Sequence, residues 1–77
     1  MTDVRFPSMS DDANALGVVA TWFVGDGEEV AEGALIAEVA MQKVDQELYA
    51  PASGVISLLV PEEQAVSQGG VIATIEG

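Results

Sequence analysis

The second half of the chain repeats the first half after a shift of 36 positions. Identical residues meet at Val24 and Val60, Val30 and Val66, Gly33 and Gly69, Ile36 and Ile72, and Ala37 and Ala73. Phe6-Pro7 corresponds to Ala50-Pro51 at a slightly larger offset, as a difference in loop length would produce. Two similar halves in a chain of 77 residues predict two sheets related by a pseudo-two-fold axis, which close into a flattened barrel or sandwich.

Turn residues divide the chain into short runs of about 5–8 residues, which is the usual length of a strand. The breakers are Gly25-Asp26-Gly27, Gly33, Pro51 to Gly54, Pro61-Glu62-Glu63 and Gly69-Gly70. The runs Gly17 to Val24, Val55 to Val60 and Val71 to Ile75 are rich in β-branched and aromatic residues. We therefore expect an all-β fold with about four strands from each half.

One stretch favours the opposite interpretation. From Ala34 to Leu48 most residues are good helix formers, and apolar residues recur there at four-residue spacing. The repeat favours strands instead, because Leu35 to Val39 matches Val71 to Ile75, which has little helical character. Periodicity alone leaves both interpretations open.

The chain is expected to form one small domain, residues 1–77, with neither cysteine nor histidine. A domain of this size buries only about 60% of the surface of its unfolded chain, so the apolar core must stabilise it without disulfides. The absence of both residue types excludes a thiol nucleophile, a Ser-His-Asp arrangement and an ordinary zinc site. We expect no intrinsic catalysis and no bound metal.

Thirteen acidic residues against two basic ones give a net charge of −11. This charge repels nucleic-acid phosphates and anionic lipids, so neither is an expected partner. It keeps a protein soluble, and it also favours basic protein surfaces. No run approaches the ~20 apolar residues of a membrane span, and Met1 to Arg5 lacks the build of a signal peptide. A cytoplasmic location and a monomeric domain are expected.

The single lysine, Lys43, lies where two strand-like segments are joined by a tight bend, Ala40 to Val44. A chain with one side-chain amine on a projecting turn has one place for an acyl group to be attached through a lysine. On its own such a residue is an ordinary solvated turn lysine. Its surroundings decide between the two interpretations.

The segment Glu38 to Ile56 resembles the modification region of the biotinyl/lipoyl attachment domains. Lys43 stands seven residues before Ala50-Pro51 and eleven before Gly54, and Trp22 to Gly27 resembles the family's Trp-aliphatic-Val and Gly-Asp turn. The resemblance covers nearly the whole chain. It implies two four-stranded antiparallel sheets with the target lysine at a hairpin tip, where a covalently attached cofactor acts as a swinging arm.

The residues beside Lys43 bear on which cofactor is attached. Biotin carriers place Ala-Met directly before the lysine, whereas Ala40-Met41 is displaced here by one residue. Gln42 and Ala40 also depart from the lipoyl pattern, whereas Val44 fits it. The resemblance implies lipoate in amide linkage to Lys43, with biotin as the alternative, and Met41, Gln42 and Val44 as the residues that a lipoate-protein ligase or lipoyl transferase recognises.

A lipoyl domain implies three further partners: a thiamine-dependent 2-oxo acid dehydrogenase, an acyltransferase and a dihydrolipoyl dehydrogenase. The resemblance also implies that a loop near the lysine helps these enzymes to identify the domain. That loop contains Ser8, Met9, Ser10, Asp11 and Asp12. Since no Ala/Pro-rich linker is present, we expect a free-standing carrier or an excised domain. A biotin carboxyl carrier and an unmodified interaction module of the same fold are the alternatives.

Overall fold

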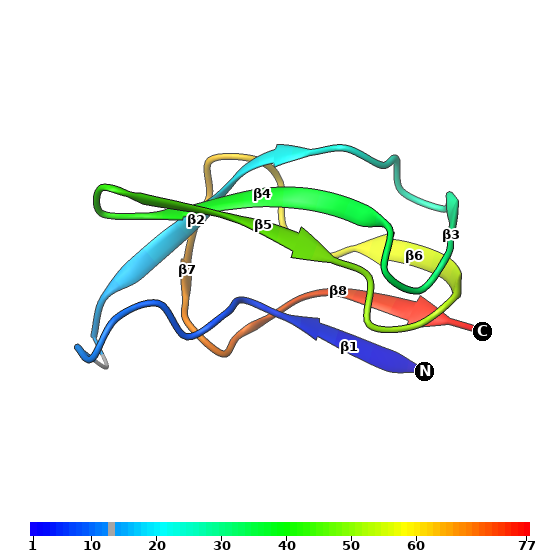
Figure 1. The fold of residues 1–77 in the computed structure, drawn as a ribbon, viewed down its shortest axis with the longest axis horizontal. Coiled ribbons are helices and arrows are strands. Elements are labelled where there is room, and N and C mark those ends of the chain that lie inside the picture. The colour runs from blue at the N-terminus through cyan, green and yellow to red at the C-terminus, as the bar shows by residue number, and fades with distance from the viewer. Residues whose placement is uncertain (13) are drawn as a thin grey trace.

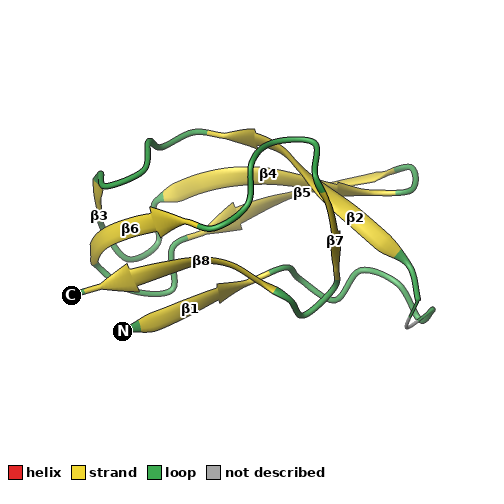
Figure 2. Cartoon of the chain, turned by 180° about the vertical axis from the view of Figure 1, so that it is seen from behind, coloured by secondary structure: helices red, strands yellow, loops and turns green. Residues whose placement is uncertain are grey.

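The computed structural model describes residues 1–12 and 14–77, and every regular element in them is a β-strand. The eight strands are β1 (Thr2–Arg5), β2 (Leu16–Trp22), β3 (Glu29–Val30), β4 (Leu35–Met41), β5 (Val44–Tyr49), β6 (Gly54–Leu58), β7 (Ala65–Ser67) and β8 (Val71–Glu76). They form two four-stranded sheets in which all neighbouring strands are antiparallel (Figure 1, Figure 2). The all-β prediction is confirmed.

The two sheets have equivalent strand orders. The terminal sheet has the order β1-β8-β6-β3, and the hairpin sheet has the order β5-β4-β2-β7. Position by position, β1 corresponds to β5, β8 to β4, β6 to β2 and β3 to β7. Each sheet therefore takes two strands from each half of the chain, and the sequence repeat reflects this pseudo-two-fold arrangement.

Backbone hydrogen bonds in the loops repeat with the same symmetry. In each half, the residue that precedes a proline makes two backbone hydrogen bonds to a pair of consecutive residues, the first of which is glycine. Its N–H donates to the carbonyl oxygen of the second residue of the pair, and its carbonyl oxygen accepts from the N–H of the glycine. The bonds are Phe6 N to Gly70 O at 2.9 Å and Gly69 N to Phe6 O at 2.8 Å, then Ala50 N to Ala34 O at 2.8 Å and Gly33 N to Ala50 O at 2.8 Å. Gly33 and Gly69 have φ angles of 85° and 81°, a left-handed conformation that glycine adopts readily.

The core consists of buried apolar side chains from both sheets. Its members are Val4, Phe6, Val19, Val30, Ile36, Ala37, Val39, Met41, Ala50, Ile56, Ile72, Ala73 and Ile75. Full burial of a Val, Ile, Met or Phe side chain contributes about 1.5–3 kcal/mol. No polar side chain is buried among the described residues, so the core is purely apolar.

The stretch with helical periodicity is two strands and a turn. Leu35–Met41 is β4 and Val44–Tyr49 is β5, so the helical interpretation of residues 34–48 is wrong. A register shift between Leu35 and Ala37 places both Ile36 and Ala37 in the core, which explains why the alternation along β4 is imperfect. Packing of the inward side chains between the sheets overrides the local helix propensity.

The packing around residue 17 leaves no room for a side chain, so the residue is glycine. A Cβ atom on this residue would collide with the ring of Phe6 and would lie 2.8 Å from the carbonyl oxygen of Ala40. Phe6 is one of the largest fully buried side chains. The absent side chain of Gly17 therefore makes room for the aromatic ring that fills the core beneath β2.

The molecule is elongated, with principal extents of 33 × 19 × 19 Å. The β4–β5 hairpin forms one end, and the N- and C-terminal strand ends lie at the other (Figure 1). The described residues of the connection between β1 and β2 also reach the hairpin end, and the view from behind agrees (Figure 2). In the part of the chain that the structure describes, no helix is long and apolar enough to cross a membrane.

Candidate functional site

Lys43 lies in the two-residue turn that joins β4 to β5. Six residue pairs hold the two strands together, and the last pair, Met41 and Val44, directly flanks the turn. Gln42 has a φ of 57°, whereas Lys43 does not have a positive φ. A positive φ at the first central residue only is the pattern of type II′ turns, whose twist matches that of the flanking strands. The ladder thus fixes the position of the turn.

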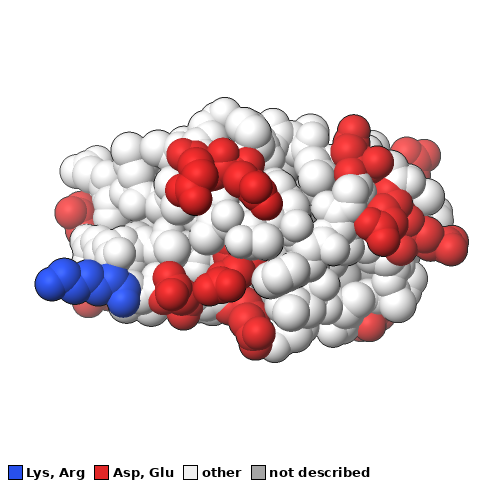
Figure 3. Space-filling view, turned by 90° about the horizontal axis from the view of Figure 1, so that it is seen from above, with Lys and Arg blue, Asp and Glu red and all other residues white. Residues whose placement is uncertain are grey.

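The side chain of Lys43 is exposed, and among the described residues it has neither a hydrogen-bond nor an ion-pair partner. The only other basic residue, Arg5, lies 3.4 Å from Asp3 and donates to the carbonyl oxygen of Gly69 at 2.9 Å. Basic atoms project from the end of the molecule at which the hairpin lies (Figure 3). The amine of Lys43 is therefore open to an external enzyme.

The three residues predicted to be recognised around Lys43 differ in accessibility. Gln42 is exposed, and Val44 is 55% exposed although it is apolar. Met41 is only 3% exposed and belongs to the core. An approaching protein meets the side chains of Gln42 and Val44, whereas Met41 anchors the base of the hairpin.

Acidic residues follow Lys43 along β5. Asp45 and Glu47 are exposed, and Glu47 stands opposite Glu38 in the ladder, where like charges repel. Acidic side chains lie in several groups over the face seen in Figure 3. The hydroxyl of Tyr49 donates to Glu47 Oε1 at 2.7 Å, and this hydrogen bond, together with the negative charge of Glu47, raises the pKa of Tyr49. Lys43 is thus a single positive charge at the end of an acidic ribbon.

The predicted recognition loop lies at the same end as the hairpin. Ser8, Asp11 and Asp12 are exposed, whereas Met9 and Ser10 are half-buried and Met9 packs against the core. The side chain of Gln68, in the turn between β7 and β8, makes hydrogen bonds to this loop. Gln68 was not predicted as a site residue, because no local sequence pattern marks a contact between residues so distant along the chain.

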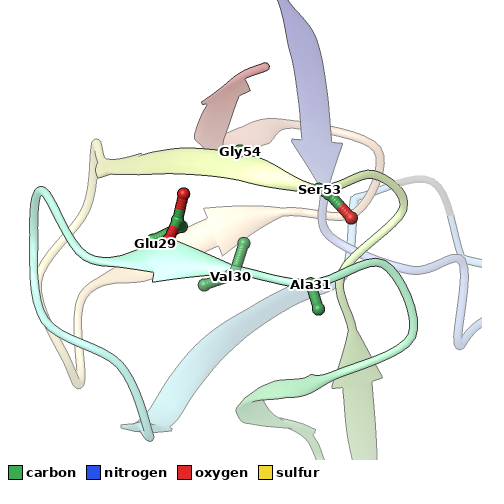
Figure 4. A pocket seen from close by; sticks show the side chains of 5 residues that line it. All are labelled: Glu29, Val30, Ala31, Ser53 and Gly54. Carbon is green, nitrogen blue, oxygen red and sulfur yellow. The ribbon is translucent and has the colours of Figure 1, made fainter.

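A shallow pocket lies at the opposite end of the molecule from the hairpin. It is lined by Glu29, Val30, Ala31, Ser53 and Gly54 (Figure 4). The Ser53 hydroxyl accepts a hydrogen bond from the N–H of Glu32 at 2.8 Å, so it already has a structural partner. Within residues 1–12 and 14–77, no group of three or more acidic side chains is placed to hold a metal ion. Neither feature competes with Lys43 as a functional site.

The comparisons with known proteins agree with this geometry. The sequence model of the biotin and lipoyl attachment family, described as that of biotin-requiring enzymes, matches residues 2–75. The chain is 38% identical to the dihydrolipoyllysine-residue acetyltransferase component of the pyruvate dehydrogenase complex of Corynebacterium glutamicum, with 96% of this chain and 11% of that protein covered. It is 31% identical to the dihydrolipoyllysine-residue succinyltransferase component of the 2-oxoglutarate dehydrogenase complex of Cupriavidus necator, with 99% and 18% covered.

A solved structure shows the same fold. The lipoyl domain of the 2-oxoglutarate dehydrogenase complex from Azotobacter vinelandii superposes with a TM-score of 0.82 at 31% sequence identity, over 100% of this chain and 98% of that one. The chain belongs to the biotin and lipoyl attachment family. The relatives named above are lipoyl proteins, which confirms the prediction of a lipoyl domain over a biotin carrier and defines a carrier without catalysis of its own. The chain spans less than a fifth of the length of the two acyltransferase components named above.

Proposed function

We propose that Lys43 carries a lipoyl group in amide linkage to its Nζ, and that the domain transfers acyl groups and reducing equivalents within a 2-oxo acid dehydrogenase complex. One observation carries the choice of residue. Lys43 is the only lysine of the chain, it is exposed, and it lies at the apex of a hairpin whose base is anchored in the core. The lipoyl relatives support the choice of group.

The chain positions the arm and takes no part in the chemistry. Bound lipoate supplies a disulfide that accepts an acyl group with two electrons and is reoxidised after the acyl group has been passed on. A rigid hairpin keeps the root of the arm in one place, so its far end stays at a high effective concentration around the domain. Amide formation also removes the positive charge of Lys43 and leaves the hairpin end more acidic.

A separate enzyme is needed to attach the group. Lys43 has no hydrogen-bond partner among the described residues, so no neighbouring side chain is placed to take a proton from its amine. A lipoate-protein ligase or lipoyl transferase would therefore supply activated lipoate and accept the proton. Gln42 and Val44 are exposed for its approach. Met41 would act indirectly, by anchoring the base of the hairpin in the core.

The relatives support the choice of partners, because they are acyltransferase components of two such complexes. The domain would meet a thiamine-dependent 2-oxo acid dehydrogenase, an acyltransferase and a flavin-containing dihydrolipoyl dehydrogenase in turn. The acidic surface favours basic surfaces on these enzymes and raises their association rate at low ionic strength.

Incubation with each of two purified ligases tests the proposal. The chain is treated with a lipoate-protein ligase, lipoate and ATP, and in parallel with a biotin-protein ligase, biotin and ATP, and its intact mass is measured. The matched control is Lys43→Arg, which keeps the positive charge but offers no amine for amide formation. Since the side chain is exposed, circular dichroism and the melting temperature of this variant should equal those of the parent chain.

The expected result is one lipoyl increment on the parent chain and none on Lys43→Arg. An increment on the control variant would place the modification elsewhere. A biotin increment alone would assign the domain to a carboxylase, and no increment in either reaction would make it an unmodified interaction module.

A further inference from the structure

The two halves of the fold differ in one connection. Between β5 and β6 the chain needs only four residues, 50–53, to pass from one sheet to the other. The equivalent connection between β1 and β2 has ten residues, 6–15. The additional residues are not needed to join the sheets, because the shorter connection does so in the other half. Residues 6–12 and 14–15, the described part of the longer connection before β2, reach the end of the molecule that carries the Lys43 hairpin (Figure 1).

One side chain makes four hydrogen bonds to the backbone of this longer connection. Gln68 Oε1 accepts hydrogen bonds from the N–H groups of Met9 at 2.9 Å and Ser10 at 3.1 Å. Its Nε2 donates to the carbonyl oxygens of Ser10 at 3.0 Å and Asp12 at 2.9 Å. The oxygen and the nitrogen of one side-chain amide thus make hydrogen bonds to four backbone groups that lie 56–59 positions away in the sequence.

The turn that carries Gln68 is itself fixed. Its neighbours Gly69 and Gly70 exchange backbone hydrogen bonds with Phe6, whose ring is buried in the core. The guanidinium of Arg5 donates to the Gly69 carbonyl oxygen at 2.9 Å. The amide of Gln68 is therefore held in a fixed position relative to the core. Its hydrogen bonds to the loop fix the loop relative to the core as well.

The pseudo-symmetric counterpart of Gln68 is Glu32, which has no such role. In the described structure the Glu32 side chain is exposed and makes no hydrogen bond. The clamp thus exists only in the half with the long loop and only at the lysine end. Asp11 and Asp12 remain exposed on the clamped loop. The consequence is a preformed acidic projection at the same end of the molecule as the lysine hairpin (Figure 1).

We propose that Gln68 is a positioning residue for acyl transfer to the carried group: its amide presets residues 9–12 so that a dehydrogenase component binds the loop and the hairpin together. This inference rests on the proposed lipoyl function. Preorganisation lowers the entropic cost of binding, so loss of the clamp weakens association with the dehydrogenase and leaves the chemical step unchanged. Attachment of lipoate by the ligase does not depend on the clamp.

The test uses the lipoylated chain and the variants Gln68→Ala and Glu32→Ala. Each is assayed for reductive acylation by the dehydrogenase components of the Corynebacterium glutamicum pyruvate dehydrogenase and Cupriavidus necator 2-oxoglutarate dehydrogenase complexes, with the corresponding 2-oxo acid. For Gln68→Ala, KM for the domain should rise about tenfold with kcat unchanged, and the rate of lipoylation should equal that of the parent. Glu32→Ala should match the parent in all three quantities.

The remaining outcomes decide against the inference. A KM for Gln68→Ala equal to that of Glu32→Ala overturns it, and so does a fall in kcat or in lipoylation rate, which would show a general structural role. Amide hydrogen exchange of the parent chain gives a check that needs no variant, since unprotected N–H groups at Met9 and Ser10 would also overturn it. A parent chain that is not lipoylated, or that neither dehydrogenase acylates, refutes the proposed function itself.

Discussion

Glu63 occupies in the second half of the chain the backbone conformation that Gly27 occupies in the first, with φ angles of 68° and 84°. The two positions are related by the 36-residue repeat. The pseudo-two-fold fold thus requires a left-handed residue at both places. Only one of the two places has glycine, so Glu63 is a site of local backbone strain.

Glu63→Gly should therefore stabilise the domain. A left-handed conformation costs a residue with a Cβ atom about 1–2 kcal/mol, and the greater freedom of glycine in the unfolded chain offsets part of that gain. We expect the free energy of unfolding to rise by roughly 0.5–1 kcal/mol in urea titrations. Gln64→Gly, at a neighbouring exposed residue without a positive φ, is the control and should be destabilising. If both variants lose stability, Glu63 is not strained.

The position of the lysine within the turn should be critical for its modification. The double variant Gln42→Lys with Lys43→Gln keeps one lysine in the same turn but moves it to the residue with positive φ, where the side chain leaves the ribbon in another direction. We expect the ligase to modify this variant at least about 100-fold more slowly, because small errors in the placement of a reacting group have large kinetic effects. Intact mass over time measures the rate, with lipoylation at the parent rate as the contradicting result.

The acidic loop should contribute a salt-dependent part of partner binding. Asp11→Asn with Asp12→Asn removes two exposed charges at the hairpin end of the molecule. We expect KM for the dehydrogenase component to rise at low ionic strength and the difference to shrink at high salt, because exposed charges are screened. Glu29→Gln with Glu32→Gln removes the same charge at the far end and should have no such effect. Equal behaviour of the two double variants would make the effect one of net charge alone.

The hydrogen bond between Tyr49 and Glu47 should be visible in a pH titration. Tyr49 is the only tyrosine, so the ultraviolet absorbance of tyrosinate reports its ionisation without ambiguity. The hydrogen bond to Glu47 and its negative charge raise the pKa of Tyr49. Glu47→Gln removes the charge and should move the titration to lower pH. An unchanged titration curve would mean that this contact does not form in solution.

The repeat explains why so much of the fold was predictable. Ala34 to Leu48 shows helical spacing by itself, but the match of Leu35 to Val39 with Val71 to Ile75 indicates a strand. The two matched segments lie in β4 and β8, which hold equivalent inner positions in the two sheets. Lys43 could be placed at a hairpin tip because a short bend separates two strand-like segments. The sequence match between two distant segments therefore predicted the strand correctly, although the local helix propensity of one segment favoured a helix.

Other features depend on contacts that no local pattern encodes. Gln68 makes hydrogen bonds to residues more than fifty positions away, so these contacts could be identified only from the three-dimensional structure. Gln42 adopts a backbone conformation with positive φ. A glycine or asparagine at this position would have indicated that conformation from the sequence. Met41 stands close to Lys43 in the sequence, yet alternation along β4 points it into the core. Accessibility around the lysine therefore followed from the strand register.

A tryptic digest of the denatured chain from lipoate-producing cells tests the central claim most directly. Trypsin cuts after lysine and arginine, and this chain offers only Arg5 and Lys43. Acylation of Lys43 blocks the second cut, so the account predicts an intact fragment of residues 6–77 that carries one lipoyl increment. Separate unmodified fragments of residues 6–43 and 44–77 would contradict it.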